Sequence, residues 1–394
     1  MSDTTKTHMI EQNIKQQLAN ISGTNVEDWW IISRVRHGME VVLQTVGKVH
    51  GSGEVITQPF TCVTAINPIV ASGMTPVYTD ISADTLSIDF TKIGTKLSTD
   101  TRAIILQHSF GIPADVKALF AAMQPSHDTK PLIIEDSAHC LGFIARSTDK
   151  RLPDVSLHSF GAEKFLNTRY GAAIWVNPAM EDTELYTALH NSLNNLPKAQ
   201  INVAMRVAIY PWLNALLNRL PRVISHKLRQ MLLHLGALRS PIVPIECQGI
   251  NYESCQKLSN RQLENVAKEL ALYNVYYEHR LKISKIYVEN INAAYIPKAL
   301  RQNAFSCVRF PIIAHSEQQA QQWFEDLRAQ GYFIGKWYRP LIFPGVTNKI
   351  YGYRQGSCKV ADNVSRAIAN LPTGLQITPN VAKEIADAIN RTGN

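Results

Sequence analysis

The sequence has no uncharged apolar run of 18 residues, which excludes an ordinary membrane-spanning helix. Its 20 glycines and 19 prolines are too few for a fibrous or linker-like chain, and no long polar tract predicts disorder. Six cysteines occur without a CxxC pair, so the sequence predicts neither a disulfide scaffold nor a metal site. The polar opening residues do not predict a secretory signal, and we expect a cytoplasmic protein.

The composition is that of a globular chain with a basic balance. Of the 394 residues, 45% are hydrophobic and 18% are charged, which is enough for a large core and for two or three domains. The formal net charge is +8. This charge favours anionic partners, among them phosphates, nucleotides, nucleic acid and an acidic membrane face.

Short apolar runs alternate with helical patterns through the first half of the chain. The predicted strands are 53–57, 76–80, 103–107, 131–134, 155–157 and 172–176, and the predicted helices are 39–46, 63–71 and 114–123, after a polar helical lead-in. Continuously apolar strands separated by helices indicate a mostly parallel mixed sheet covered by helices on both faces. Ligands bind such sheets at the carboxyl ends of the strands.

The second half predicts a smaller unit. A long helix is expected over 260–287, a strand over 305–313, a helix beginning with a capping box at Ser316, a strand over 332–338 and a last helix after Thr378. We therefore expect a large domain over 1–250 and a small α+β C-terminal domain over 251–394.

A basic helical insertion separates these two parts at about 199–240. From Leu185 to Ile245 there is no acidic residue, whereas seven Lys or Arg and several leucines at helical spacing occur there. The segment fits an insertion packed on the domain or a dimer surface. It also fits contact with an anionic membrane face or with nucleic acid. No nucleic-acid motif accompanies the charge, so nucleic acid is the least favoured partner.

Polar residues follow two of the predicted strands where a ligand would bind. Asp136 and His139 follow the fourth strand, and Ser159 and Lys164 follow the fifth. A serine hydroxyl can bind a phosphate, and a lysine amine can form a Schiff base with an aldehyde. Taken singly, Asp136 also fits a helix cap or a salt bridge, and Lys164 a solvated surface residue. Gly38 and Met39, at a predicted helix start, would let a phosphate approach the backbone.

In this order, these motifs resemble the DegT/DnrJ/EryC1/StrS family of sugar aminotransferases. The similarity is strongest in the stretches 54–80, 103–115, 134–142 and 159–164, and it returns at 360–372. The resemblance implies the fold type I architecture of pyridoxal-phosphate-dependent transferases. It also implies pyridoxal 5′-phosphate as the cofactor.

The resemblance assigns roles to individual residues. Lys164 matches the lysine that holds the cofactor aldehyde and moves the proton, and Asp136 matches the carboxylate facing the pyridine nitrogen. His139 matches a position beside the cofactor ring. Ser159, Gly38 and Met39 match the phosphate cradle. Cys62 matches a residue that stacks on the ring. The whole expected cofactor site consists of Gly38, Met39, Cys62, Asp136, His139, Ser159 and Lys164.

The chain departs from the family pattern at several positions. Met39 replaces a hydroxyl residue, and Cys62 replaces an aromatic one. The loop 168–172 has no Thr-Gly-Glu-Gly-Gly sequence. The partner-subunit Asn and Arg of the family align with Cys255 and Lys257, although Asn251 could serve instead.

The resemblance predicts a homodimeric aminotransferase that moves an amino group from glutamate or glutamine to a keto-sugar nucleotide, for surface polysaccharides or secondary metabolites. His108 and the segment Trp337, Tyr338 and Arg339 are expected near the substrate, although packing roles are equally open for them. Two alternatives remain at this point. One is a non-catalytic binding or regulatory protein on the same fold, and the other is a peripheral membrane enzyme acting on lipid-linked sugars.

Overall fold

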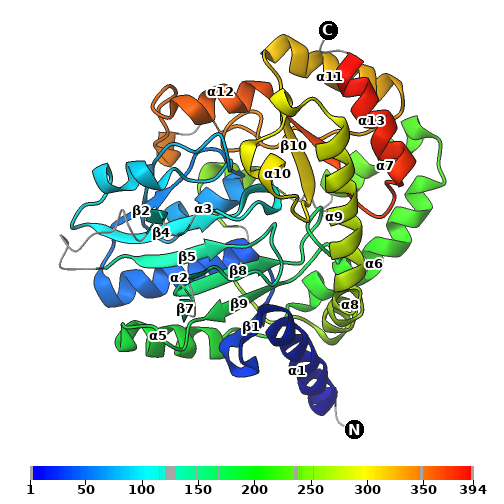
Figure 1. The fold of residues 1–394 in the computed structure, drawn as a ribbon. Coiled ribbons are helices and arrows are strands. Elements are labelled where there is room, and N and C mark those ends of the chain that lie inside the picture. Colours follow the sequence, from blue (N-terminus) through cyan, green and yellow to red (C-terminus); the bar gives the residue numbers. More distant parts are fainter. Residues whose placement is uncertain are drawn as a thin grey trace.

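A seven-stranded sheet forms the centre of the computed structural model (Figure 1). The structure describes residues 3–114, 116, 118–119, 130–147, 150–151, 153–166, 168–234, 238, 240, 242–251, 253–346 and 349–391. The order of the strands across the sheet is β1 (Trp29–Ile32), β9 (Ala172–Val176), β8 (Val155–Ser159), β5 (Leu132–Asp136), β4 (Thr101–Gln107), β2 (Glu54–Thr57) and β3 (Thr75–Tyr78). All pairs are parallel except those made by β9. The predicted mixed, mostly parallel sheet is confirmed.

Side chains alternate between the two faces of the sheet, and both faces are buried in apolar clusters. Along β1, Trp30 and Ile32 belong to one core, and Trp29 and Ile31 belong to the other. The period of two residues in a strand produces this division. Helices that cover the first face include α2 (Val35–His50), α3 (Val63–Ala71) and α5 (Thr183–Asn194). The other face is covered by α1 (Asp3–Ser22) and α8 (Asn260–Leu270).

A separate apolar core lies in the C-terminal part. It is built on the antiparallel pair β10 (Arg309–Ile313) and β11 (Ile368–Pro372). The helices packed into it are α9 (Tyr273–Asn290), α10 (Lys298–Gln302), α11 (Glu317–Ala329) and α13 (Pro379–Arg391). The expected small α+β unit is therefore present, while the boundary between 250 and 251 stays a prediction.

Two further features connect or extend these parts. The helices α6 (Ile201–Asn218) and α7 (Arg222–His234) form a hairpin beside α8, and two short strands, β6 (Arg146–Ser147) and β7 (Lys150–Arg151), pair with each other. The helix α12 (Lys359–Ala367) links the small unit to the sheet.

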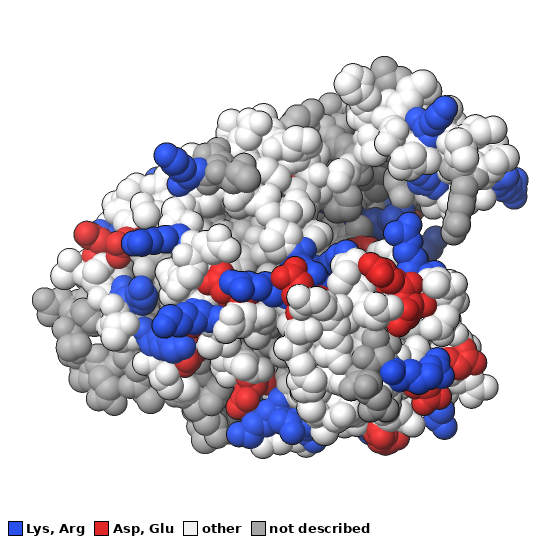
Figure 2. All heavy atoms as spheres, turned by 90° about the horizontal axis from the view of Figure 1, so that it is seen from above, with Lys and Arg blue, Asp and Glu red and all other residues white. Residues whose placement is uncertain are grey.

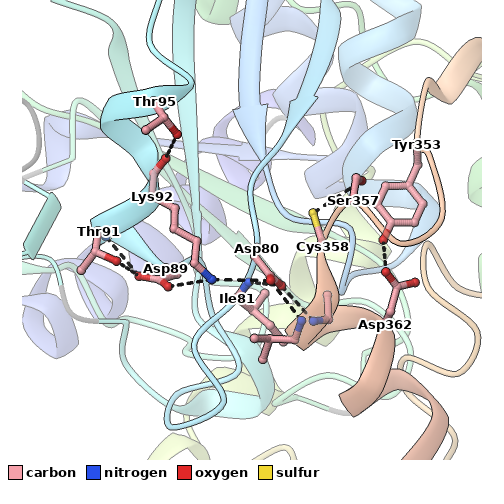
Figure 3. Close-up of polar contacts among 12 residues, drawn as sticks. Asp80, Ile81, Asp89, Thr91, Lys92, Thr95, Tyr353, Ser357, Cys358 and Asp362 are labelled. Atoms are coloured by element: carbon pink, nitrogen blue, oxygen red, sulfur yellow. Dashed lines mark hydrogen bonds and ion pairs between the residues drawn. The ribbon is translucent and has the colours of Figure 1, made fainter.

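An acidic side chain from the sheet caps α12 (Figure 3). Asp80, just after β3, accepts hydrogen bonds from the Val360 N–H at 3.0 Å and the Ala361 N–H at 2.9 Å. These are the second and third residues of the helix, whose own capping residue, Cys358, makes no side-chain cap. Lys92 bridges Asp80 and Asp89 at 3.5 and 3.1 Å. The cap thus comes from a residue about 280 positions away and fixes the start of α12 on the sheet edge.

Some expected elements differ in the structure. The predicted helix 260–287 is wrong as one element, because the chain turns at Ala271 and Leu272. Helix α8 packs into a core of the sheet, whereas α9 contributes Tyr276 to that core and its later residues to the C-terminal core. The predicted strand 332–338 is also wrong. Within it, only Gly335 forms a bridge, to Asn370, whose side-chain amide then bonds the backbone of Trp337. The strand β1 was not predicted, and the predicted helix 114–123 falls largely outside the described residues.

Candidate active site

A cavity of about 770 Å³ opens at the carboxyl edge of the sheet. Its walls come from the ends of β5 and β8, the starts of α2 and α3, and one face of α6. The predicted site residues that line it are Cys62, His108, Asp136, His139, Ser159, Lys164 and Tyr338. Residues from segments more than a hundred positions apart therefore meet at the edge where ligands of such sheets bind.

Asp136 is the last residue of β5 and is buried. Burial raises the pKa of Asp136, against the opposing effects of the Ala138 N–H, which donates to Oδ1 at 3.0 Å, and of the Lys164 charge. In the protein alone, burial therefore destabilises the ionised form of Asp136. A cationic group of a ligand placed beside it would relieve that destabilisation.

Lys164 lies in the turn that follows β8. The backbone N–H of Lys164 donates to the Gly161 carbonyl at 3.3 Å, and the preceding residue, Glu163, has a φ of 60°. Burial lowers the pKa of Lys164, against the opposing charges of Cys62 and Asp136. The neutral amine, which is the nucleophilic form, is thereby favoured.

His139 connects this lysine to the backbone. The Phe110 N–H donates to Nδ1 of His139 at 3.0 Å, and Nε2 lies 2.8 Å from Nζ of Lys164. Burial lowers the pKa of His139 well below its usual value, so the ring is neutral and its single proton is on Nε2. Nε2–H then donates to Nζ, which accepts only as a neutral amine.

Gly38 and Met39, which were expected at a helix start, lie inside α2. Helix α2 begins at Val35 and not at Met39, so the predicted helix start is wrong. The Gly38 N–H already donates to the Arg34 carbonyl, and a Cβ on Gly38 would lie 2.4 Å from Ile32 Cδ1. Gly38 and Met39 are buried against the sheet and do not line the cavity, whereas Arg34, Val35 and Arg36 do.

Ser159 is at the end of β8 and faces the cavity. Its hydroxyl accepts a hydrogen bond from the Gly161 N–H at 3.2 Å. The rest of its hydrogen-bonding capacity can be directed to a ligand, because a hydroxyl offers one donor and two acceptor positions.

His108 is fully buried and both of its ring nitrogens are bonded. Nδ1 accepts from the Ala114 N–H at 3.0 Å, and Nε2 lies 2.8 Å from Glu135 Oε1. Glu135 also accepts from the Ser156 hydroxyl and from the Ala145 N–H. This geometry fits the packing role for His108 better than substrate contact.

The three predicted residues of the C-terminal part point in different directions. The Trp337 ring stacks on the His139 ring, with centroids 5.4 Å apart and 10° between the planes, and Lys164 Nζ lies 5.0 Å from its centroid. Tyr338 is buried on the cavity wall. Arg339 turns away and bonds Glu317 at 3.1 Å.

The sequence reading missed the guanidinium groups on the cavity wall, which belong to Arg34, Arg36 and Arg169. Arg34 lies over the Tyr170 ring and Arg169 over the Tyr210 ring, with centroid distances of 4.7 and 4.4 Å. The departure of the loop 168–172 from the family pattern was the available signal for Arg169. For Arg34 and Arg36 the available signal was their position just before the predicted helix start at Gly38 and Met39.

Comparisons with known proteins agree with this picture. Residues 32–230 match the model of the DegT/DnrJ/EryC1/StrS aminotransferase family. Three solved structures share the fold. The putative sugar aminotransferase Spr1654 from Streptococcus pneumoniae, in its PMP form, is 19% identical, with a TM-score of 0.72 over 98% of this chain and 92% of that one. The sugar aminotransferase CalS13 from Micromonospora echinospora is 18% identical, with a TM-score of 0.67 over 96% and 91%. Helicobacter pylori PseC, an aminotransferase involved in the biosynthesis of pseudoaminic acid, is 16% identical, with a TM-score of 0.70 over 100% and 96%.

Proposed function

The chain belongs to the DegT/DnrJ/EryC1/StrS aminotransferase family and uses pyridoxal phosphate, and from this premise we propose that it aminates a keto-sugar carried on a nucleotide. The amino donor is glutamate or glutamine. The product serves the synthesis of surface polysaccharides or secondary metabolites. The observation that carries the proposal is the Lys164 amine, whose pKa is lowered by burial, bonded to His139 in the cavity that Asp136 also lines.

The residues that line the cavity fit the cofactor. The raised pKa of Asp136, caused by burial, marks a carboxylate that gains from a cationic neighbour, as a protonated pyridine nitrogen would be. Lys164 would hold the aldehyde carbon. Ser159 and the guanidinium group of Arg34 would hold the phosphate, because charge-assisted bonds from arginine suit phosphate oxygens, whereas Arg36 is paired with Glu246.

Pyridoxal phosphate, when bound, supplies an aldehyde that condenses with amines and a ring that draws electrons from the neighbouring carbon. The protein supplies the proton transfers. Burial lowers the pKa of Lys164, which favours the neutral form of Nζ that can accept a proton from a substrate carbon and later return it. Nε2–H of His139 orients that amine, and the Trp337 ring covers the histidine on one side and limits the access of water.

The proposed acceptor is a nucleotide-linked sugar because of the charge on the cavity wall. Arg34, Arg36 and Arg169 line one cavity. Arg36 is paired with Glu246 at 2.5 Å, and Glu253 and Glu269 also line the cavity. With Arg34 at the cofactor phosphate, Arg169 would contact the diphosphate. The volume of about 770 Å³ is also large enough for a nucleotide-linked sugar beside the cofactor.

We also propose that the working form is a cytoplasmic homodimer. A twofold pair is the commonest oligomer, and a site near a subunit interface could receive side chains from the partner. Sedimentation of the cofactor-loaded protein tests this. A mass of twice 44.1 kDa is expected, and a monomer that turns over at full rate would contradict it.

Steady-state turnover tests the proposed reaction. The cofactor-loaded enzyme is supplied with glutamate or glutamine and a set of nucleotide-linked keto-sugars, and both the oxo acid and the amino sugar are measured. The variant Lys164→Ala is the control and should give neither product. Release of oxo acid without any aminated sugar would overturn the substrate class, and the absence of both products would overturn the function.

A further inference from the structure

The hairpin of α6 and α7 presents an apolar outer face with no partner among the described residues. Along α6, four side chains are exposed at spacings of four, three and four residues: Met205, Ile209, Trp212 and Leu216. Their exposed fractions run from 43% to 68%. Such spacing puts them on one stripe of the helix, and large exposed apolar patches are uncommon on soluble proteins.

The opposite face of α6 packs against the rest of the protein. Tyr210 and Asn214 line the active-site cavity, and Leu217 is fully buried. The outer stripe is therefore not a core face left open by a misplaced helix, because α6 already buries its other side.

The second helix continues the outer face. Val223, Ile224 and Met231 of α7 are between 50% and 69% exposed. Lys227 is exposed and falls between them on the helix wheel. Helix α7 thus combines apolar groups with a cation on one surface.

The hairpin carries charge of one sign only. No acidic residue occurs from Leu185 to Ile245, a stretch that holds seven Lys or Arg. Figure 2 shows the hairpin as a lobe projecting at the upper right, with blue and white spheres and no red in view. The rest of the surface in that view mixes both colours, so the lobe is electrostatically distinct.

We propose that this outer face, named here the hairpin face and made of Met205, Ile209, Trp212, Leu216, Val223, Ile224, Lys227 and Met231, docks on an anionic phospholipid bilayer. The apolar side chains would enter the boundary between headgroups and acyl chains. Trp212 suits that boundary, since an indole has an apolar body and a polar N–H. Lys227 and Arg219 would contact lipid phosphates.

The arrangement requires the hairpin to lie in the plane of the interface. Among the described residues, no helix has the length and hydropathy needed to cross a bilayer. Amphipathic helices with a cationic and apolar surface bind in this lying position.

Charge complementarity favours a bilayer over a second copy of the hairpin. Two identical hairpin faces would bring Lys227 and the neighbouring Arg219 of one copy close to those of the other, and the stretch 185–245 has no carboxylate to pair with them. Like charges facing each other oppose association, whereas an anionic lipid surface attracts every one of them.

Docking would hold the active site close to the lipid. The stripe and the cavity residues Tyr210 and Asn214 are on opposite sides of one helix. A helix with its side chains is about 10 Å across, so the cavity wall would lie roughly that far from the bilayer.

Vesicle binding by the full-length, cofactor-loaded enzyme tests the proposal. Cosedimentation is measured with vesicles of phosphatidylcholine alone and of phosphatidylcholine with phosphatidylglycerol, at low and at high salt. We expect binding to the anionic vesicles only, weakened by salt because the Debye length falls from about 10 Å to about 3 Å between 0.1 and 1 M. No binding to anionic vesicles at low salt would overturn the proposal.

Matched variants locate the binding surface. Val223→Ser and Lys227→Glu are compared with Val275→Ser and Lys285→Glu, which change an exposed valine and an exposed lysine of α9. We expect Lys227→Glu to weaken binding at least fivefold, from about 1 kcal/mol per cation, and Trp212→Ser to weaken it further, while the α9 variants bind as the wild type does. Equal losses in both sets would overturn the assignment to the hairpin face.

Sedimentation without vesicles tests the alternative that a protein surface, and not a bilayer, covers the hairpin face. If Trp212→Ser reduces the size of the assembly in solution and the wild type binds no vesicles, a protein surface covers the hairpin face and the membrane proposal fails. Far-UV circular dichroism and thermal unfolding confirm that each variant is folded. Amination of a soluble sugar nucleotide should stay at the wild-type rate in all of these variants.

Discussion

Nε2 of His139 lies 2.8 Å from Nζ of Lys164, and Nδ1 of the same ring accepts the Phe110 amide proton. A backbone N–H can only donate, so this contact sets the tautomer of the neutral ring. The proton on Nε2 is consequently aimed at the lysine. This contact favours the neutral form of the amine at the position where the cofactor aldehyde would react.

This relationship predicts the effect of replacing the histidine. In His139→Ala the lysine loses its donor, so more of the amine is protonated at neutral pH. We expect pyridoxal phosphate to react more slowly with the apoprotein and the acid limb of that rate to move to higher pH. His139→Gln retains an N–H donor and should stay close to the wild type. Absorbance after mixing, measured across pH, checks both variants, and an unmoved acid limb in His139→Ala would refute the role.

Asp136→Asn should separate stability from activity. Burial raises the pKa of Asp136 in the folded state, so its stabilising contribution is present at low pH and is lost as the pH rises through the folded value. At neutral pH the apoprotein variant should therefore unfold at a higher temperature than the wild type, with the difference shrinking toward about pH 4. Turnover should fall on the order of a hundredfold or more, about 3 kcal/mol.

The neighbouring acid gives the opposite result and serves as the control. Burial raises the pKa of Glu135, but the hydrogen bond and charge of His108, with the bonds from Ser156 and Ala145, outweigh it and lower the pKa overall. Its ionised form is thus stabilising above the unfolded pKa, and that stability is lost as the pH falls. Glu135→Gln should cost roughly 1–3 kcal/mol at neutral pH. If both variants shift the unfolding temperature in the same direction at neutral pH, the account of this strand end is wrong.

Asp80→Ala tests the cap on α12. The change removes the acceptor for the Val360 and Ala361 N–H groups and should lower the free energy of unfolding by about 1 kcal/mol, up to about 2. Asp84→Ala is the control, since its ion pair with Lys298 is more than half exposed and should contribute less than about 1 kcal/mol. Denaturant unfolding of both variants measures the difference. Equal effects would show that the contacts in Figure 3 do not stabilise the helix.

The sheet was predictable because its strands are apolar throughout. Helix α3 runs from Val63 to Ala71 as expected, and the strand ends at Asp136 and Ser159 are where the sequence indicated polar groups. The edge strand β1 was missed, because its sequence lies in a segment that reads as a polar lead-in. Its sequence, Trp-Trp-Ile-Ile, has no polar alternation, because both faces of the strand are buried in apolar clusters.

The arrangement of the remaining site residues depends on tertiary contacts that the local sequence does not predict. Trp337 meets His139 because the side chain of Asn370 bonds the backbone of Trp337 and holds that segment over the sheet edge. The start of α2 was misplaced because Gly38 packs closely against Ile32 inside the helix, while the residues that hold the phosphate stay a prediction. The predicted aminotransferase family is confirmed, while the individual roles of the site residues stay predictions.

Borohydride trapping tests the central claim most directly. The purified protein is given pyridoxal phosphate, its visible spectrum is recorded before and after reduction with borohydride, and the labelled peptide is identified by mass. The account predicts a yellow protein whose colour is lost on reduction, with one label, on Lys164. A colourless protein, or label spread over many surface lysines, would contradict the account and would favour a non-catalytic role for this fold.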